Sequence, residues 1–266
     1  MTEVERRAAL DAIAAEVAVC NRCRLYETRT KAVPGEGTAA TEVIFVGEGP
    51  GFNEDRQGKP FVGQAGALLT ELLASVGWSR DEVFITNVVK CRPPENRDPE
   101  PDEIAACGPF LARQLEALDP ALVVTLGRFS MARFSPGSRI GQVHGTFRKA
   151  DPESGAPEAL TFAMYHPAAA LHQGSLKATL FRDMEGVPAA LIEARNLRAA
   201  MPAQPATDTA AAVPAAPAIA AAPATSPPDA AMPARTERIS TTGGAGRAND
   251  VDTTTESDPT DQLGLF

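Results

Sequence analysis

The sequence predicts an α/β domain with a mainly parallel sheet, followed by a segment of very different composition. Within residues 1–197, short apolar β-branched runs alternate with segments whose apolar residues recur at helical spacing. This alternation is typical of parallel strands joined by crossover helices. Several runs end at glycine or proline, with polar side chains close behind. Because ligands bind beyond the carboxyl ends of parallel strands, we expect the functional site there.

The predicted elements follow in chain order. Val4, Ala8, Ile13 and Val17 would share one face of an N-terminal helix. Buried strands are predicted within 42–47, 82–91, 120–126 and up to Tyr165. Helices are predicted within 63–78, with Gly77 as the C-cap, and within 99–118 and 175–194. Three motifs follow strands, "GEGPG", "TNVVKCRPP" and "YHPA", so they are expected to meet at one edge of the sheet.

Residues 198–260 are rich in Ala, Pro and Thr. Proline interrupts any helix that the alanines could start, and bulky apolar side chains are too few to offset the entropy of ordering. We therefore expect a disordered linker, whose root-mean-square reach would be roughly 40–45 Å. The predicted domains are thus 1–197, the linker 198–260 and a terminal peptide 261–266.

Charge and hydropathy limit the function classes only partly. The net charge is -9, and the segment from Ala199 onward contributes eight acids against three arginines. The remaining body is only mildly acidic, so a local basic cleft and DNA binding are not excluded. No run approaches the ~20 apolar residues of a membrane span, and the N-terminus lacks a signal-peptide layout. We expect a cytoplasmic protein without a membrane partner.

Four cysteines form a C-x2-C pair followed by two distant members. Two disulfides would be unusual in a cytosolic chain, so metal binding is the leading interpretation and unrelated buried thiols the alternative. Spacing alone does not separate zinc from an iron–sulfur cluster. The candidate ligands are Cys20, Cys23, Cys91 and Cys107.

Three long motifs, in this order and together with the cysteines, resemble the family 4 uracil-DNA glycosylases, the bacterial and archaeal iron–sulfur type. They are "GEGPGFNEDRQGKPFVGQAGALL", "ITNVVKCRPPENRDPEPDEIAAC" and "YHPAA". The match runs from about Cys20 to Leu191. The resemblance implies a three-layer α/β/α fold with a four-stranded mainly parallel sheet, and a 4Fe-4S cluster on the four cysteines, with zinc as the less favoured occupant. It also implies uracil-containing DNA as the substrate, and we expect a monomer.

The chemistry of uracil excision suits these residues. Cleaving the glycosidic bond builds positive charge on the sugar and negative charge on the departing base, once the base has left the stack. The Asn87 amide can donate to uracil O4 and accept from N3–H, a pattern that cytosine cannot match. By resemblance, Phe61 stacks on the base, His166 binds O2 and steadies the leaving anion, and Glu48 and Gly49 position water. Glu48 is the candidate general base or an electrostatic partner of the sugar cation. Glu54 would exclude the methyl group of thymine, with a solvated loop residue as the alternative.

DNA contacts are predicted less specifically. Basic residues near the motifs could meet phosphates, namely Lys59, Lys90, Arg92 and Arg97. Leu171, His172 or Gln173 could enter the base stack as a wedge. His144 stands where the family has a basic residue, as a phosphate contact or without a role. Residues 91–103 contain no histidine and no insert, so we expect ordinary turnover and not a covalent complex with DNA.

Two other function classes remain open at this stage: a non-catalytic nucleic-acid binder of the same fold, and an iron–sulfur electron carrier. Asn87, Phe61 and His166 would have no purpose in an electron carrier, and Glu48 and His166 none in a pure binder. A uracil-DNA glycosylase acting in base excision repair is therefore the main prediction.

The chain ends in QLGLF, which resembles the pentapeptide by which bacterial replication and repair proteins bind the sliding clamp. In an extended peptide, Leu265 and Phe266 would fill an apolar pocket and Gln262 would hydrogen-bond at its edge. Leu263 matches the second position of the consensus. An apolar end without function is the alternative.

Overall fold

The computed structural model describes residues 1–200. The sheet is six-stranded, in the order β1-β3-β2-β4-β6-β5. Its four inner strands, β3 (Phe84–Asn87), β2 (Val43–Gly47), β4 (Leu122–Leu126) and β6 (Leu160–Met164), run parallel. They are buried throughout, which explains their continuous apolar sequences.

The sheet has two more strands than the sequence predicts. β1 (Glu36–Gly37) and β5 (Phe147–Lys149) pair antiparallel with the two outer parallel strands. The four-stranded prediction is therefore wrong for the edges, although it holds for the parallel centre. Both edge strands are short and neither is buried, so they lack the apolar run that reveals an inner strand.

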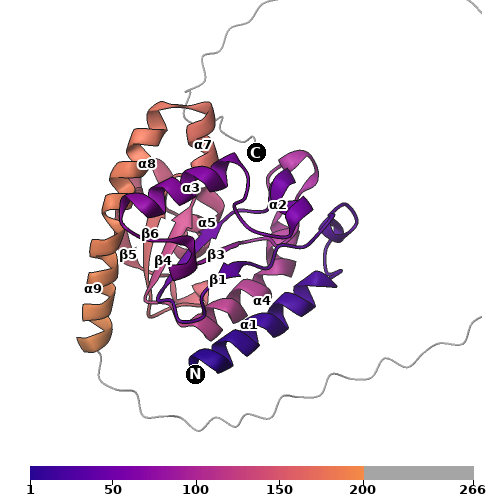
Figure 1. The fold of residues 1–266 in the computed structure, drawn as a ribbon, viewed down its shortest axis with the longest axis horizontal. Coiled ribbons are helices and arrows are strands. Elements are labelled where there is room, and N and C mark those ends of the chain that lie inside the picture. The colour runs from indigo at the N-terminus through magenta and orange to yellow at the C-terminus, as the bar shows by residue number, and fades with distance from the viewer. Residues whose placement is uncertain (201–266) are drawn as a thin grey trace, which may run out of the picture. The chain divides into compact units, whose positions relative to one another are not determined.

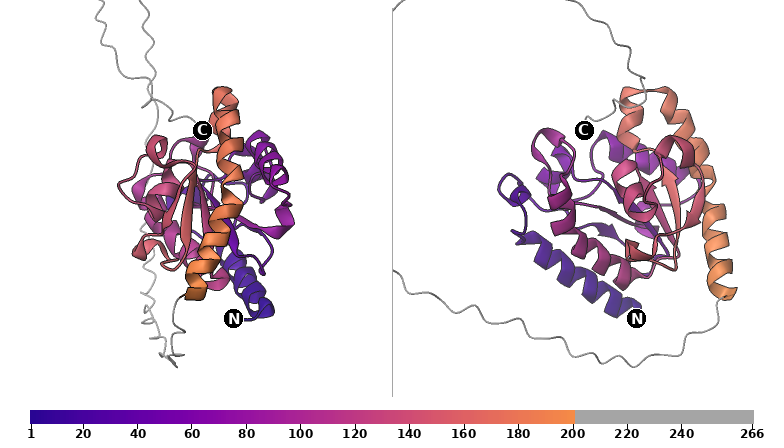
Figure 2. Two further views of the ribbon diagram at one scale, coloured as in Figure 1. Left: turned by 90° about the vertical axis from the view of Figure 1, so that its left-hand side faces the viewer. Right: turned by 180° about the vertical axis from the view of Figure 1, so that it is seen from behind.

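Helices cover both faces of the sheet, which confirms the three-layer α/β/α prediction. One apolar cluster joins the sheet to α3 (Gln64–Ser75), α7 (Pro167–His172), α8 (Ser175–Glu185) and α9 (Val187–Ala200). A second joins the opposite face to α1 (Glu3–Ala18), α4 (Pro101–Leu118) and α5 (Arg128–Phe134). Figures 1 and 2 show α1 beside α4 on one side of the sheet and α8 and α9 on the other.

Local sequence signals set the helix ends. Thr2 and Glu5 form a reciprocal capping box that begins α1. At the end of α3, Gly77 follows the cap residue Val76 with φ +78° and donates its N–H to the Ala74 carbonyl, while Trp78 donates to Leu73. This is a Schellman termination, as the predicted glycine stop requires. The predicted face of α1 is correct at Ile13 and Val17 but wrong at Val4, which is 79% exposed, and at Ala8, which is also exposed; Leu10 is buried instead.

The remaining described elements are short: α2 (Phe52–Gln57), α6 (Ile140–Val143), and the 3-10 turns at Arg24–Tyr26, Arg80–Glu82, Pro94–Asn96 and Pro152–Ser154. Among residues 1–200 no helix is long and apolar enough to cross a bilayer. The predicted linker, apart from its first three residues, and the predicted clamp peptide lie outside the described residues.

Candidate active site

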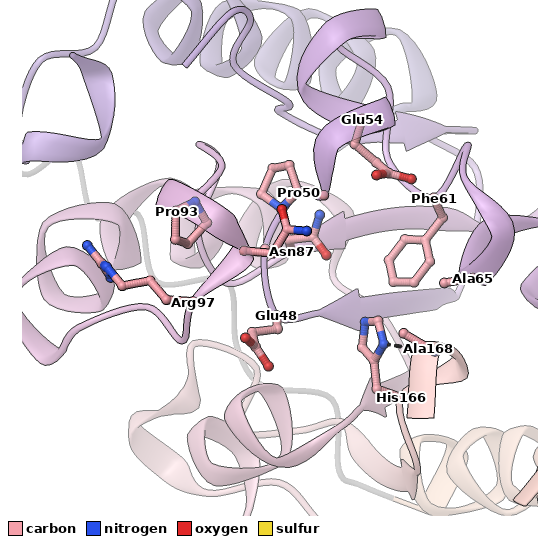
Figure 3. A pocket seen from close by; sticks show the side chains of 13 residues that line it. Glu48, Pro50, Glu54, Phe61, Ala65, Asn87, Pro93, Arg97, His166 and Ala168 are labelled. Carbon is pink, nitrogen blue, oxygen red and sulfur yellow. Dashed lines mark hydrogen bonds between the residues drawn. The ribbon is translucent and has the colours of Figure 1, made fainter. Parts of the chain in front are cut away.

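A cavity of about 170 Å³ opens at the carboxyl ends of the parallel strands. Glu48 follows β2, Asn87 ends β3 and His166 follows β6. Phe61 and Glu54 reach the cavity from the segment between β2 and α3, and Gly49 and Arg97 also line it. The structure thus brings together residues that lie up to 118 positions apart in the chain. Figure 3 shows the Asn87 amide and the Phe61 and His166 rings turned toward a common space.

Asn87 is buried, and its side-chain oxygen has an open hydrogen-bonding position. Its side chain lies on the sheet face of α3, because Ile85, two residues earlier, packs in the same cluster as α3. The residue is 1% exposed. Asn87 Oδ1 and Arg198 Nε are the buried side-chain polar atoms of residues 1–200 without a hydrogen-bond partner. An orphaned buried acceptor costs about 1–3 kcal/mol, so a ligand that donates to it would be favoured.

Gly47 allows the two base-facing side chains to approach each other. It pairs with Asn87 in the sheet register. A Cβ at this position would lie 2.3 Å from Asn87 Oδ1 and 2.6 Å from Phe61 Cζ. The absence of a side chain is therefore a condition for this arrangement. Sequence reasoning did not single out Gly47, although it is the first residue of the first motif.

Phe61 lies in a strained loop that several groups hold in place. Its φ is +52°, a left-handed conformation that costs a non-glycine residue roughly 1–2 kcal/mol. Arg80 donates to the Phe61 carbonyl at 3.1 Å and to the Pro60 carbonyl at 2.9 Å. Glu54 Oε1 accepts from the Val62 and Gly63 N–H groups, both at 2.8 Å. The ring is thereby fixed with its centroid 5.6 Å from that of His166.

His166 is neutral with a defined tautomer. Its Nδ1 accepts the Ala168 N–H at 3.2 Å, as the N-cap of α7. Nε2 must therefore carry the ring hydrogen. Burial lowers the pKa of His166 to about 4, because the charged ring would lose hydration. The ring can thus donate a hydrogen bond at neutral pH without carrying charge.

Glu48 has an environment that suits a proton acceptor. Burial raises the pKa of Glu48 to about 7, and the neighbouring charge of Asp98 adds to the rise. Arg128 acts in the opposite direction, and it forms an ion pair with Asp98. A carboxyl group whose pKa lies near neutrality is present in both protonation states at physiological pH, as general acid–base catalysis favours.

The basic residues predicted to contact DNA differ in their exposure and in their pairing partners. Lys59 is exposed and pairs with Glu36 at 3.3 Å. Arg92 donates to Asn96 Oδ1 at 2.6 Å. Arg97 lines the cavity but is tied to the buried Glu103 by contacts of 2.9 and 2.7 Å.

The prediction for Lys90 is wrong, because the residue is 1% exposed and cannot meet a phosphate in this structure. Its ammonium donates to Thr86 Oγ1, to the Asn87 carbonyl and to Gln114 Oε1, at 2.6, 2.7 and 2.7 Å. Burial lowers the pKa of Lys90 to about 7. The side chain therefore supports the backbone of Asn87 from the opposite face of the sheet.

The residues with less specific predictions lie near the site. Leu171, His172 and Gln173 are exposed at the end of α7, which begins next to His166. His144 Nδ1 lies 2.9 Å from Asp183 Oδ2, and its ring centroid is 4.7 Å from that of Tyr165. His144 therefore packs against Tyr165, the residue directly before His166, and its side chain is 28% exposed.

The four cysteines border a second, smaller cavity on the other side of β3. Cys20 and Cys23 lie between α1 and the turn Arg24–Tyr26, Cys91 follows β3, and Cys107 belongs to α4. Arg29 Nη1 donates to Cys91 Sγ at 3.1 Å and the Lys90 N–H to Cys107 Sγ at 3.2 Å. Burial raises the pKa of Cys107 to about 11 and also raises those of Cys23 and Cys91, so thiolates here need a positive partner.

The donor set of this cavity fits a metal centre. Zinc takes four ligands about 2.3 Å from each sulfur, and an iron–sulfur cluster is held by four cysteine thiolates on separate iron atoms. All four cysteines line one cavity, and thiolates ligate both groups.

Comparison with known proteins agrees with this geometry. The family model of the uracil DNA glycosylase superfamily matches residues 34–185. The type-4 uracil-DNA glycosylase of Saccharolobus solfataricus is 48% identical over 188 residues, which is 68% of this chain and 86% of the relative. The chain belongs to the type-4 uracil-DNA glycosylases.

Other relatives extend this result. The type-4 uracil-DNA glycosylase of Archaeoglobus fulgidus is 44% identical over 187 residues, which is 67% of this chain and 91% of the relative. That of Thermotoga maritima is 48% identical over 135 residues, 51% of this chain and 70% of the relative. The family resemblance predicted from the motifs is thus confirmed.

The glycosylase cavity also contains residues that sequence reasoning did not single out: Pro50, Gly51, Ala65, Pro93, Asn96 and Ala168.

Proposed function

We propose that the cavity receives a uracil flipped out of DNA and that Asn87, Phe61 and His166 recognise it. The observation that carries this proposal is the buried Asn87 Oδ1 without a partner. Uracil N3–H would satisfy this acceptor, while the amide NH2 would donate to O4. Cytosine has no hydrogen on N3 and an amino group at C4, so it would leave both groups of Asn87 unsatisfied.

The other cavity residues complete the proposed reaction. Phe61 would stack on the base, and the neutral His166 would donate from Nε2 to O2, where negative charge develops as the glycosidic bond breaks. Glu48 would accept a proton from the attacking water or balance the positive charge on the sugar. Glu54, fixed by two backbone N–H groups, would limit the space next to C5 and so disfavour thymine.

This assignment can be tested by excision from an oligonucleotide with a single uracil, followed by alkali and separation of the strands. The wild type should give strand scission at the uracil, because the protein is a uracil-DNA glycosylase. Asn87→Asp should lose at least about 100-fold in rate, since it replaces the donor to O4 by an acceptor and adds a buried charge.

A matched control is Asn196→Asp, which makes the same chemical change at an exposed residue of α9. This variant should keep the wild-type rate. If Asn87→Asp also kept it, the proposed base recognition would be wrong, while scission by the wild type would still report the activity itself.

We also propose that Cys20, Cys23, Cys91 and Cys107 hold a 4Fe-4S cluster. The cavity that all four side chains line and the resemblance of the cysteine motifs to the iron–sulfur type support this proposal. When bound, the cluster would act as a structural crosslink between the end of α1, the end of β3 and α4. Two contacts would stabilise thiolates that hold it: the Arg29 guanidinium donates to Cys91 Sγ, and the Lys90 backbone N–H donates to Cys107 Sγ.

Iron and sulfide analysis of the purified protein tests this proposal, together with its visible absorption spectrum. We expect iron and sulfide in equal amounts and a broad charge-transfer band, all lost in Cys23→Ser. A protein that contains zinc and lacks sulfide would contradict the cluster. Neither alternative function, a non-catalytic binder or an electron carrier, is favoured by a specific observation in this site.

A further inference from the structure

We propose that Phe52, with Arg56 and Arg92 beside it, forms a stacking site for an unpaired nucleobase next to the flipped uracil. This inference rests on the proposed function, because it places the neighbouring nucleotide of the same DNA strand. It assigns a substrate contact outside the base cavity, at its rim.

Phe52 is an aromatic side chain that the fold does not use. It is the first residue of α2 and is 51% exposed. The buried residue of this helix is Asp55, whose carboxylate accepts the Thr30 N–H. Phe52 belongs to none of the apolar clusters of the described residues. Its ring therefore contributes little to the core and stays in water at an energetic cost.

Two guanidinium groups lie next to this ring. The Arg92 guanidinium carbon is 5.2 Å from the ring centroid and that of Arg56 is 5.6 Å away. Within the described part of the chain, neither arginine forms an ion pair, in contrast to Arg97 and Arg24. Lys31 is also exposed and lies beside Gly58, at the end of α2. These charges are available to phosphates, whereas those of Arg97 and Arg24 are neutralised.

The position of Phe52 connects it to the base cavity. Gly51, the preceding residue, lines that cavity, as do Pro93 and Asn96 on the segment of Arg92. Arg92 is oriented by its 2.6 Å hydrogen bond to Asn96. A nucleotide adjacent to a uracil in the cavity would therefore meet the surface of Phe52, Arg56 and Arg92.

The composition of this surface selects its partner. Exposed aromatic rings together with cations are the means by which proteins bind single-stranded nucleic acid, since every base has a flat face for stacking and a nearby phosphate. In an intact duplex the base faces are covered by their neighbours. Removal of one base from the stack exposes the face of the next one, which Phe52 can then cover.

The test compares Phe52→Ala with the wild type on single-stranded oligonucleotides containing one uracil. We expect KM to rise at least about fivefold, the lower end of what stacking one base on an aromatic ring contributes. We expect kcat to stay within twofold, because the ring does not touch the reacting atoms. Phe147→Ala is the matched control: Phe147 is 45% exposed but lies on the edge strand β5, and KM should not change.

Substrates with an abasic analogue on the 5′ or the 3′ side of the uracil locate the stacked base. The KM effect of Phe52→Ala should disappear when the contacted neighbour is missing and persist when the other one is. Phe52→Trp should restore the wild-type KM. Its added tryptophan fluorescence should be quenched by a uracil-free oligonucleotide, while the fluorescence of the wild type, which has a single tryptophan, should change little.

The proposal would be overturned by an unchanged KM in Phe52→Ala, or by an equal KM effect on both abasic substrates. Retention of the wild-type melting temperature shows that the variant is folded, and thermal unfolding is measured in parallel. Failure of this inference is distinguishable from failure of the proposed function, since the latter would appear as a wild-type excision rate in Asn87→Asp with Phe52 in place.

Discussion

At the scale of single residues, Glu48 determines how the reaction should depend on pH. The pKa of Glu48 is about 7 in the folded protein, raised by burial and by Asp98. A general base must be deprotonated, so the excision rate should increase as pH rises through about 7 and level off above it. Single-turnover excision measured from pH 5 to 9 checks this. Glu48→Gln should lower the plateau by about 100-fold or more and remove the rise.

His166 supplies the complementary expectation. Its pKa of about 4 lies below the measured range, so its neutral form persists throughout and it should add no second inflection. A rate that falls with rising pH near neutrality would contradict the assignment of Glu48 as the base.

The ion pair of Asp98 and Arg128 should tune this pH dependence in opposite directions. Asp98 raises the pKa of Glu48 and Arg128 lowers it. Asp98→Asn should therefore move the midpoint of the rate profile to lower pH, and Arg128→Gln should move it to higher pH. Each shift should be a few tenths of a unit, since the pair is partly exposed and screened by solvent. Shifts of the same sign in both variants would show that the effect is structural and not electrostatic.

The sequence predicted which residues line the cavity, but it did not predict the contacts that hold these residues in place. Asn87, Glu48 and His166 could be found because they follow apolar runs, where a parallel sheet exposes its strand ends. Lys90 could not be placed from its charge: it stands between Val89 and Cys91, and its three acceptors come from β3 and from Gln114 of α4. Such a contact depends on tertiary packing, about which a local pattern carries no information.

At the scale of elements, the close approach of β2 and β3 at their carboxyl ends makes Gly47 a sensitive position. In Gly47→Ala, the added methyl group would meet Asn87 Oδ1 at 2.3 Å and Phe61 Cζ at 2.6 Å. Both base-binding groups must move, and a displacement of this kind can cost about 100-fold in rate. We expect kcat/KM for uracil excision to fall by about that factor.

Gly77→Ala provides a contrasting variant. Gly77 ends α3 with φ +78°, and a Cβ there would meet no atom within 4 Å. The substitution should lower the free energy of unfolding by about 1–2 kcal/mol through backbone strain, with little change in kcat/KM. Thermal unfolding and steady-state kinetics of both variants separate the two effects. Equal losses of activity would contradict the role of Gly47 in positioning Asn87.

The elements that the sequence missed have a common physical basis. The parallel strands are covered by helices on both faces, so burial forces them to be continuously apolar. β1 pairs through two residues and all three residues of β5 are exposed, so their pairing depends on backbone hydrogen bonds that any residue can make. The error in α1 has another origin, because at about 100° per residue Val4 and Ala8 lie on the opposite side of the helix from Ile13 and Val17.

At the scale of the whole molecule, β3 connects the two sites. Asn87, the proposed base-recognition residue, ends the strand, and Cys91 follows four residues later. Lys90 lies between them, with its ammonium on the Asn87 carbonyl and its N–H on Cys107. A crosslink at the cysteines would therefore limit the motion of the base site, although it takes no part in the chemistry.

The last prediction concerns the peptide QLGLF at residues 262–266, which we propose as a binding motif for a bacterial sliding clamp. Deletion of these five residues should abolish binding to an immobilised clamp, because Leu265 and Phe266 would no longer fill its apolar pocket. The substitution of both residues by alanine should have the same effect. Activity on free oligonucleotides should stay at the wild-type level in both variants, since the changes lie beyond residues 34–185, which the family model matches. Tethering through the predicted linker would raise the local concentration of the enzyme on DNA without fixing its orientation, so the clamp should accelerate excision on clamp-loaded DNA only when the peptide is intact. Equal clamp binding by the truncated protein would contradict the proposed motif.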